Sequence, residues 1–125
     1  MNGAVFIYIG ALTVILWGIA HLFPTRNVVR GFGPISKDNQ RIITMEWITE
    51  GVAMIFVGTL LTVVTWIDPA SPVSLAVYWT TAMALVTLAV VSFFTGFKVS
   101  FFPFKLCPFI FSASAILTLA GAYLA

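Results

Sequence analysis

Four long stretches of apolar residues constrain the fold of this chain more than any other feature. Three of them contain no charged residue, namely 3–23, 73–96 and 108–125. The fourth, 42–66, contains only Glu46 and Glu50. A helix needs roughly 20 apolar residues to cross a hydrocarbon core of about 30 Å. Because the stretches are too continuous for the alternating strands of a barrel, we expect transmembrane helices.

The stretches predict an all-α fold, an antiparallel four-helix transmembrane bundle that forms a single domain over 1–125. The expected helices cover about 3–23, 38–66, 73–96 and 108–125. Charged residues make up 8% of the chain, against about 25% in a typical soluble domain, so the expected surroundings are a lipid bilayer. Residues 31–34 (Gly-Phe-Gly-Pro) should interrupt any helix. Ser36 is suited to cap the start of the second long helix, whose first residues are polar.

All six Lys and Arg residues lie in two predicted loops, 24–41 and 97–107. Helices of alternating direction place these loops on one side of the membrane. The positive-inside rule assigns that side to the cytoplasm, which leaves both termini outside together with the short loop 67–72. We therefore expect a multi-pass protein of a bacterial inner (cytoplasmic) membrane. The net charge of +2 is spread over these loops, so no nucleic-acid partner is expected.

Small residues recur at spacings that let membrane helices approach closely. The positions concerned are Gly51 and Gly58, Thr80 and Ala84, and the series Ser114, Thr118 and Ala122. We interpret all of them as packing positions rather than as contacts to a ligand.

A cluster of ionisable residues is the one feature that indicates chemistry. Glu46 and Glu50 are four residues apart and share a helical face. His21 is expected near the same depth, close to the end of the first helix, with Trp17 one turn deeper on its face. Ionisable side chains within a membrane usually face the bundle interior and have a partner. Because the first two helices are consecutive and antiparallel, we expect His21 and the two glutamates to lie together.

Three roles for the cluster stay open at this point. In a structural network, Glu46 pairs with Arg41 or another arginine of the loop, such as Arg26, while His21 bonds Glu50 or a backbone carbonyl. In a ligand or proton site, a carboxylate in apolar surroundings and a histidine relay a proton or polarise a small molecule. In a metal site, His21, Glu46 and Glu50 are the ligands, although di-iron bundles draw more Glu and His residues from their helices.

The residues name no cofactor. A haem held by two histidines is excluded because the chain has one, whereas ligation by His21 with Met45 or Met54 stays open. Cys107 is the only cysteine, which excludes an internal disulfide and a two-thiol redox motif. No catalytic triad and no phosphate-binding glycine loop is recognisable. A role other than catalysis is therefore favoured.

Residues 18–24 (Gly-Ile-Ala-His-Leu-Phe-Pro) resemble the end of the first helix in DoxX-like membrane proteins. Those are small four-helix bacterial proteins that often have a Gly-x-x-His-aromatic/Leu turn. Their second helix commonly carries a Gly and a Glu, and residues 50–53 (Glu-Gly-Val-Ala) are partly similar, in reversed order. The resemblance covers roughly the first half of the chain. It implies a four-helix fold and a partner subunit linked to quinone-coupled oxidation or oxidative-stress complexes.

We therefore expect a small integral membrane protein that serves as an accessory or structural subunit of a membrane complex, redox or stress-related, with a membrane-protein partner or as a homo-oligomer. The alternative is a protein that binds a small apolar ligand such as a quinone, or handles protons, on the cytoplasmic side. The candidate site residues for that alternative are His21, Glu46, Glu50, Trp17, Arg26 and Arg41.

Overall fold

The computed structural model describes residues 2–125, and every element within that range is helical. The elements are α1 (Gly3–Leu22), α2 (Thr25–Gly31), α3 (Lys37–Ile67), α4 (Pro72–Phe94), the 3-10 turn η1 (Gly96–Lys98) and α5 (Pro103–Leu124). The all-α prediction is confirmed. Four of the helices are long and apolar enough to cross a membrane. By helix length and composition, this is a multi-pass membrane protein.

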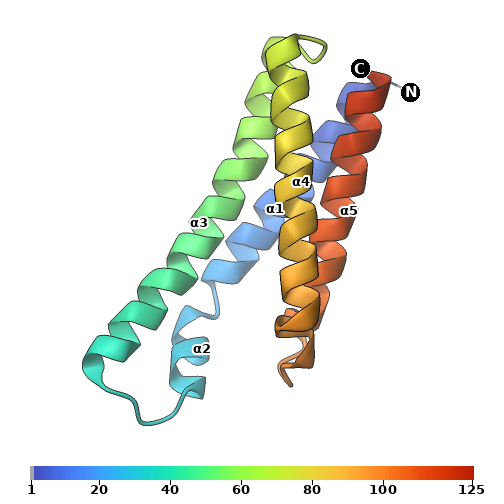
Figure 1. Ribbon diagram of the computed structural model, residues 1–125. Coiled ribbons are helices and arrows are strands. Elements are labelled where there is room, and N and C mark those ends of the chain that lie inside the picture. The colour runs from blue at the N-terminus through green and yellow to red at the C-terminus, as the bar shows by residue number, and fades with distance from the viewer. Residues whose placement is uncertain (1) are drawn as a thin grey trace.

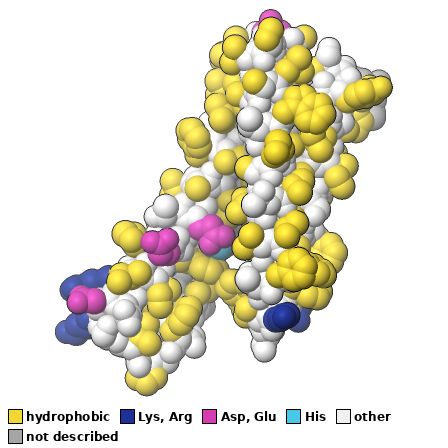
Figure 2. Space-filling model, in the orientation of Figure 1, with side chains coloured by type: hydrophobic (Ala, Val, Ile, Leu, Met, Phe, Trp, Pro, Cys, Tyr) yellow, Lys and Arg dark blue, Asp and Glu magenta, His cyan; other side chains and the backbone are white. Residues whose placement is uncertain are grey.

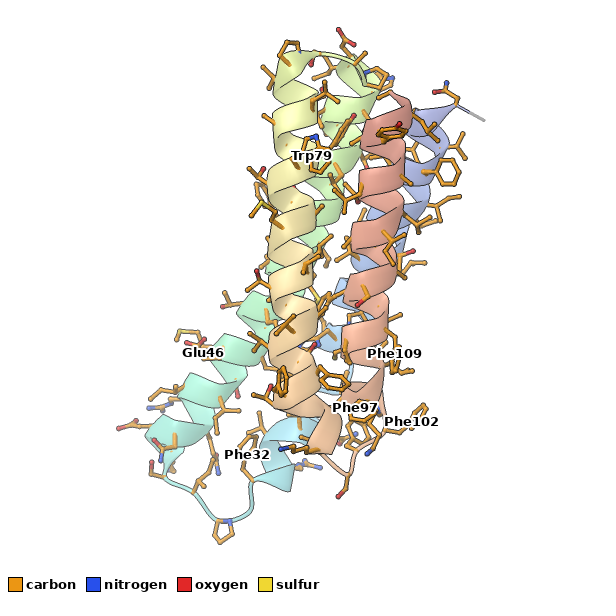
Figure 3. The ribbon with its side chains drawn as sticks, turned by 45° about the vertical axis from the view of Figure 1, so that its right-hand side comes forward. Phe32, Glu46, Trp79, Phe97, Phe102 and Phe109 are labelled. Atoms are coloured by element: carbon orange, nitrogen blue, oxygen red, sulfur yellow. The ribbon has the colours of Figure 1, made fainter. Side chains whose placement is uncertain are left out.

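The long helices run in alternating directions, and α1 lies between α3 and α5, behind α4 in the view of Figure 1. Helix α1 packs along both α3 and α5, and α4 packs along α5. Helices α3 and α4 contact each other much less. They are joined by a short turn at one end and separate toward the other (Figures 1 and 3). Helices α3 and α4 therefore lie side by side only near their turn.

The two ends of the bundle differ in charge. All six basic residues lie at the end that holds α2 and η1, and we call it the basic end. They are Arg26, Arg30, Lys37, Arg41, Lys98 and Lys105. In Figure 2 the dark blue side chains fall in two groups at the bottom of the molecule. The opposite end holds both termini and the α3–α4 turn with Asp68.

The exposed faces of the long helices are apolar, whereas small polar side chains lie inside. Phe56, Met83 and Ile116 are 65%, 69% and 65% exposed, respectively. Ser114 and Thr118 are fully buried. A water-soluble protein rarely exposes large contiguous apolar patches, while close-packed small residues inside an apolar exterior are typical of helices in lipid.

Glycines bring α1 and α3 into backbone contact. A Cβ atom added at Gly58 would lie 2.6 Å from the carbonyl oxygen of Ala11, and one at Gly18 would lie 2.8 Å from that of Gly51. No side chain fits at either position without a shift of the helices. The packing role predicted for Gly51 and Gly58 is confirmed.

On the other side of α1, the Ser114 hydroxyl of α5 donates a 2.8 Å hydrogen bond to the Gly10 carbonyl. The predicted packing series is buried, namely Ser114, Thr118 and Ala122. The predicted pair on α4 was wrong, because Thr80 and Ala84 are exposed. Spacing alone does not say which side of a uniformly apolar helix faces its neighbours, and here the neighbouring face with Leu85 is the buried one.

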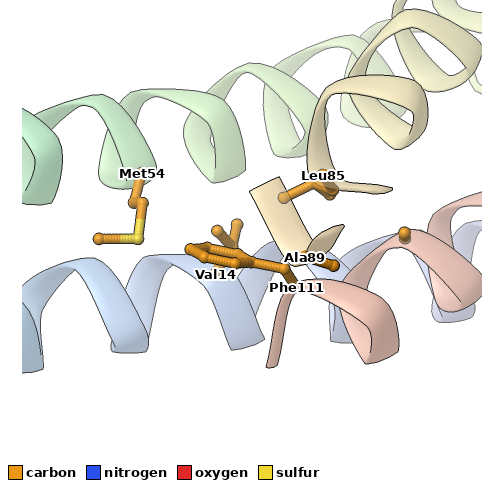
Figure 4. Close-up of a cluster of buried hydrophobic side chains, with 6 residues drawn as sticks. Val14, Met54, Leu85, Ala89 and Phe111 are labelled. Carbon is orange, nitrogen blue, oxygen red and sulfur yellow. The ribbon is translucent and has the colours of Figure 1, made fainter. Parts of the chain in front are cut away.

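Two hydrophobic clusters form the core, and each draws on all four long helices. The cluster in Figure 4 consists of Val14, Met54, Leu85, Ala89, Phe111 and Ala115. The second, nearer the termini, consists of Ile7, Ala11, Leu61, Tyr78 and Ala122. Beside the second cluster, the hydroxyls of Thr65 and Tyr78 are 2.8 Å apart, which ties α3 to α4 close to their turn.

The predicted loop 24–41 was wrong in part, because it contains the helix α2. Its predicted interruption is confirmed: α2 ends at Gly31, and Gly33 adopts a φ of 73°. The polar start of the second long helix, expected at about residue 38, is confirmed, since α3 begins at Lys37. Ser36 caps α3 as expected, since its hydroxyl oxygen accepts a 3.1 Å hydrogen bond from the Asn39 amide. Helix α2 packs against this first part of α3.

The fourth long helix begins at Pro103, five residues before its predicted start. The prediction took Pro108 as the first helical residue, but that proline lies inside α5. The additional turn is held against η1 by Lys105, whose Nζ donates a 3.2 Å hydrogen bond to the Phe97 carbonyl. The same Nζ lies 5.4 Å from the centre of the Phe97 ring. The third long helix correspondingly ends earlier, at Phe94.

Candidate functional site

His21 lies in the last turn of α1 and is 8% exposed. The close approach of Gly18 to Gly51 brings this turn against α3. As a result, the His21 Nε2 atom is 3.4 Å from the Glu50 Oε2 atom. The geometry does not make this contact a hydrogen bond, and Nε2 has no hydrogen-bond partner among the described residues. The structure thus brings together two of the three residues expected to meet, His21 and Glu50.

Trp47 is the site residue that sequence reasoning missed. Its indole ring stacks on the His21 ring with centroids 3.8 Å apart and an interplanar angle of 15°. Its Nε1 donates a 2.7 Å hydrogen bond to the His21 backbone carbonyl. Carbonyl groups in the last turn of a helix lack partners within that helix, so Trp47 satisfies one of them. This single side chain fixes both the end of α1 and the orientation of the imidazole.

A cleft of about 720 Å³ opens at the basic end, beside Trp47 and Glu50. We call it the large cleft. Its lining comes from α2, α3 and the segment around the start of α5: Asn27, Val28, Gly31, Phe32, Ile42, Ile43, Glu46, Trp47, Glu50, Val99, Phe101 and Phe104. Figure 2 shows a notch between the two arms of the molecule at this end, with acidic side chains above it. Figure 3 places Glu46 on α3, above Phe32.

A smaller pocket of about 270 Å³ lies on the His21 side of Trp47. We call it the inner pocket. It shares an aromatic wall with the large cleft, formed by Trp47, Phe101 and Phe104. The Phe104 ring is 5.5 Å from Trp47 and 6.0 Å from Phe101, centre to centre. Trp17 also lines the inner pocket, and its Nε1, like the His21 Nε2, has no hydrogen-bond partner among the described residues.

The ion pairs differ from the structural network that was expected. Arg41 pairs with Asp38, three residues before it, at 3.4 Å. It does not pair with Glu46, so that prediction was wrong. Within residues 2–125, Glu46 has no ion pair and no side-chain hydrogen bond, and Arg26 is exposed on α2 and lines neither cavity.

The structure does not bring the three suggested metal ligands together, since the described residues contain no group of three or more His, Cys, Asp or Glu side chains that could hold a metal ion. The two methionines considered for haem ligation lie elsewhere. Met54 packs in the core cluster of Figure 4, and Met45 is 56% exposed on α3. Neither lines the pocket that contains His21.

The site lies at the border of the apolar part of the bundle. Helix α1, with 20 residues, has a length of about 30 Å, which matches a hydrocarbon core. Helix α3 has 31 residues, or about 46 Å at the same rise. Because Trp47 is level with the last turn of α1, the part of α3 before it projects beyond α1. Glu46 therefore lies at this border, and Glu50 lies one turn inside it.

No protein-family model, no curated protein and no solved structure matches this chain. The resemblance to DoxX-like proteins stays a prediction that rests on residues 18–24 and 50–53. The function is therefore argued from the chemistry of the large cleft, the inner pocket and the side chains that separate them.

Proposed function

We propose that the protein binds a small amphiphilic molecule in the large cleft, one that combines an apolar body with a polar group, as a quinone does. The observation that carries the proposal is the cleft itself. Its volume of about 720 Å³ falls within the range of roughly 300–1,000 Å³ typical of small-molecule sites. Its lining is apolar and aromatic apart from Asn27, Glu46 and Glu50. A few polar groups in an apolar hollow orient a ligand while its body is buried.

The position of the cleft suits an amphiphilic ligand. It lies beside α3 at the basic end, where Trp47 is level with the last turn of α1. The cleft thus lies at the border of the apolar part of the bundle, where an amphiphilic molecule can keep its apolar body toward the bilayer and its polar group toward water. The positive-inside rule assigns the basic end to the cytoplasm, so we infer that the ligand is bound in the cytoplasmic half of a bacterial inner membrane. A protein that binds such a molecule is also consistent with the expected role as the accessory subunit of a redox complex.

Glu50 and His21 give the site a way to hold a proton. The carboxylate lines the large cleft, and the imidazole lies 3.4 Å behind it in a buried position. The two side chains thus form an acid–base pair at the wall of the cleft. The stack on Trp47 keeps the ring in place beside the carboxylate.

A variant that fills the cleft tests the proposal. Gly31 lines the cleft, and a Cβ atom there meets no other atom within 4 Å. Its φ is not in the left-handed region, so Gly31→Phe adds a ring to the cleft without backbone strain. Ala76→Phe is the matched control, because Ala76 is exposed on α4 near the other end of the bundle. Binding of the neutral apolar dye N-phenyl-1-naphthylamine to the full chain in mild detergent is measured by fluorescence.

The proposal predicts saturable binding to the wild type and to Ala76→Phe, and binding to Gly31→Phe weakened by about tenfold, the size of one lost or blocked apolar contact. Equal affinity in all three proteins refutes it. Purification in mild detergent supplies a second readout. In the contrary result, a protein partner co-purifies in stoichiometric amount and shields Phe32 and Phe101 from a chemical label. The cleft is then an interface with another subunit, and the binding role is contradicted.

A further inference from the structure

We infer that the ligand of the large cleft is a lipophilic organic cation. This inference rests on the proposed function and narrows it to one class of ligand. It is drawn from three properties of the cleft: the chemistry of its polar groups, the lack of charge compensation around them, and the aromatic rings that surround them.

The charged groups of the cleft are all acceptors. They are the carboxylates of Glu46 and Glu50, and the lining contains no Lys, Arg or His side chain. Asn27 adds a neutral amide, which can donate as well as accept. An ionised carboxylate accepts hydrogen bonds and donates none. A quinone also offers only acceptor oxygens, so it gains no hydrogen bond from these carboxylates unless they carry protons. A cation gains from both of them as they stand.

The basic residues of this end of the molecule do not neutralise the two glutamates. Arg41 pairs with Asp38 at 3.4 Å, and the Lys105 ammonium donates to the Phe97 carbonyl at 3.2 Å. Within residues 2–125, no ion pair involves Glu46. Glu46 is exposed and has no ion pair, and Glu50 faces only His21 at 3.4 Å in the described part of the chain. A cationic ligand can therefore approach both carboxylates without displacing a Lys or Arg side chain.

The environment of His21, whose ring lies behind Glu50, is a second observation that indicates a ligand. His21 is 8% exposed, and its Nε2 approaches Glu50 to 3.4 Å without making a hydrogen bond. A buried ring nitrogen that is left without a partner is unusual. The ring lines the inner pocket rather than the large cleft, so it leaves the cleft side of Glu50 open to a cation.

Aromatic side chains complete the match. Phe32, Trp47, Phe101 and Phe104 line the same cleft as the two carboxylates. The face of an aromatic ring attracts cations, most strongly for Trp, by about 0.5–2 kcal/mol depending on desolvation. Apolar rings combined with two carboxylates recognise a cation that carries its own apolar substituents, while a hydrated ion such as Na⁺ gains little from the rings.

A matched pair of probes tests the inference on the wild-type protein. Methyltriphenylphosphonium and triphenylphosphine oxide have the same three rings and nearly the same size, but only the first is charged. Their affinities for the full chain in an uncharged detergent are compared by calorimetry. We expect the phosphonium to bind at least about tenfold more tightly, the combined effect of one carboxylate contact and one ring contact. The double variant Glu46→Gln with Glu50→Gln should remove this preference and leave the affinity for the oxide unchanged.

Asp38→Asn is the charge-matched control, because Asp38 lies at the same end of the molecule but outside the cleft lining. It should leave the preference for the phosphonium unchanged. Equal affinities for the two probes in the wild type overturn the inference and leave the proposed function in place. Failure of both probes to bind overturns the two together. If the double variant does not fold, the single variant Glu46→Gln, at an exposed position without an ion pair, should still reduce the preference.

Discussion

The close approach of α1 and α3 leads to a quantitative prediction for Gly58→Ala. A Cβ atom at this position would lie 2.6 Å from the carbonyl oxygen of Ala11, whereas ordinary contact begins at 3.4 Å. The two helices must therefore move apart locally by about 0.8 Å, because a backbone oxygen cannot rotate away. Overpacking of this kind typically costs about 1–3 kcal/mol. The gain in helix propensity from Gly to Ala offsets about 0.5–1 kcal/mol of it.

The expected net result is a decrease in the free energy of unfolding of up to about 2.5 kcal/mol, with a central value near 1 kcal/mol. Gly31→Ala is the matched control, because the same methyl group meets nothing within 4 Å there. It should be neutral or slightly stabilising. Gly51→Ala should lie between the two, since its nearest contact is the flexible end of the Leu22 side chain at 2.6 Å.

The assay is unfolding of the full chain in mixed micelles with increasing sodium dodecyl sulfate, followed by far-ultraviolet circular dichroism. The predicted order of stability is Gly31→Ala above Gly51→Ala above Gly58→Ala. If Gly58→Ala is as stable as Gly31→Ala, the helices do not pack through these glycines, and the argument for the position of His21 beside α3 fails with it.

Two further predictions concern the hydrogen bonds that α1 accepts from its neighbours. Ser114→Ala removes the buried hydrogen bond to the Gly10 carbonyl and should lower the free energy of unfolding by about 0.6–1.5 kcal/mol in the same titration. The control Thr13→Ala removes only a hydrogen bond within one helix, at a more exposed position, and should lower it by less than half as much. Equal effects of the two variants contradict the packing described. Trp47→Phe keeps an aromatic ring but removes the hydrogen bond to the His21 carbonyl. Amide hydrogen exchange measured by mass spectrometry should therefore become faster in the last turn of α1, while the middle of the helix is unchanged. Unchanged exchange in that turn shows that the indole does not hold the end of α1 in place.

The number and approximate positions of the long helices could be predicted because they follow from uninterrupted apolar stretches. An uncharged stretch of the necessary length has few alternatives to a membrane helix. The cap of α3 was predictable for a similar local reason, because Ser36 accepts from Asn39 three residues later. Helix α2 was missed because its seven residues carry no apolar periodicity of their own, and its neighbour α3 packs against it.

The site could be predicted only in part. Glu50 and His21 were expected together because consecutive antiparallel helices bring their nearby ends into contact, and the structure shows this contact. The role of Trp47 depends on the carbonyl of a residue 26 positions away, which no local pattern reveals. Glu46 turned out to lack the arginine partner that was expected, because Arg41 pairs with an acid on its own helix.

Photolabelling of the large cleft tests the central proposal most directly. The wild-type chain in liposomes is exposed to a neutral apolar probe that carries a diazirine. Labelled residues are mapped by mass spectrometry with and without an excess of the same compound lacking the diazirine. The proposal predicts saturable labelling of Phe32, Phe101 and Phe104 that the excess suppresses, above an unsaturable background on lipid-exposed Phe56 and Met83. Labelling that follows exposure alone, at equal levels in the cleft and on the outer faces and insensitive to competition, contradicts a binding site there.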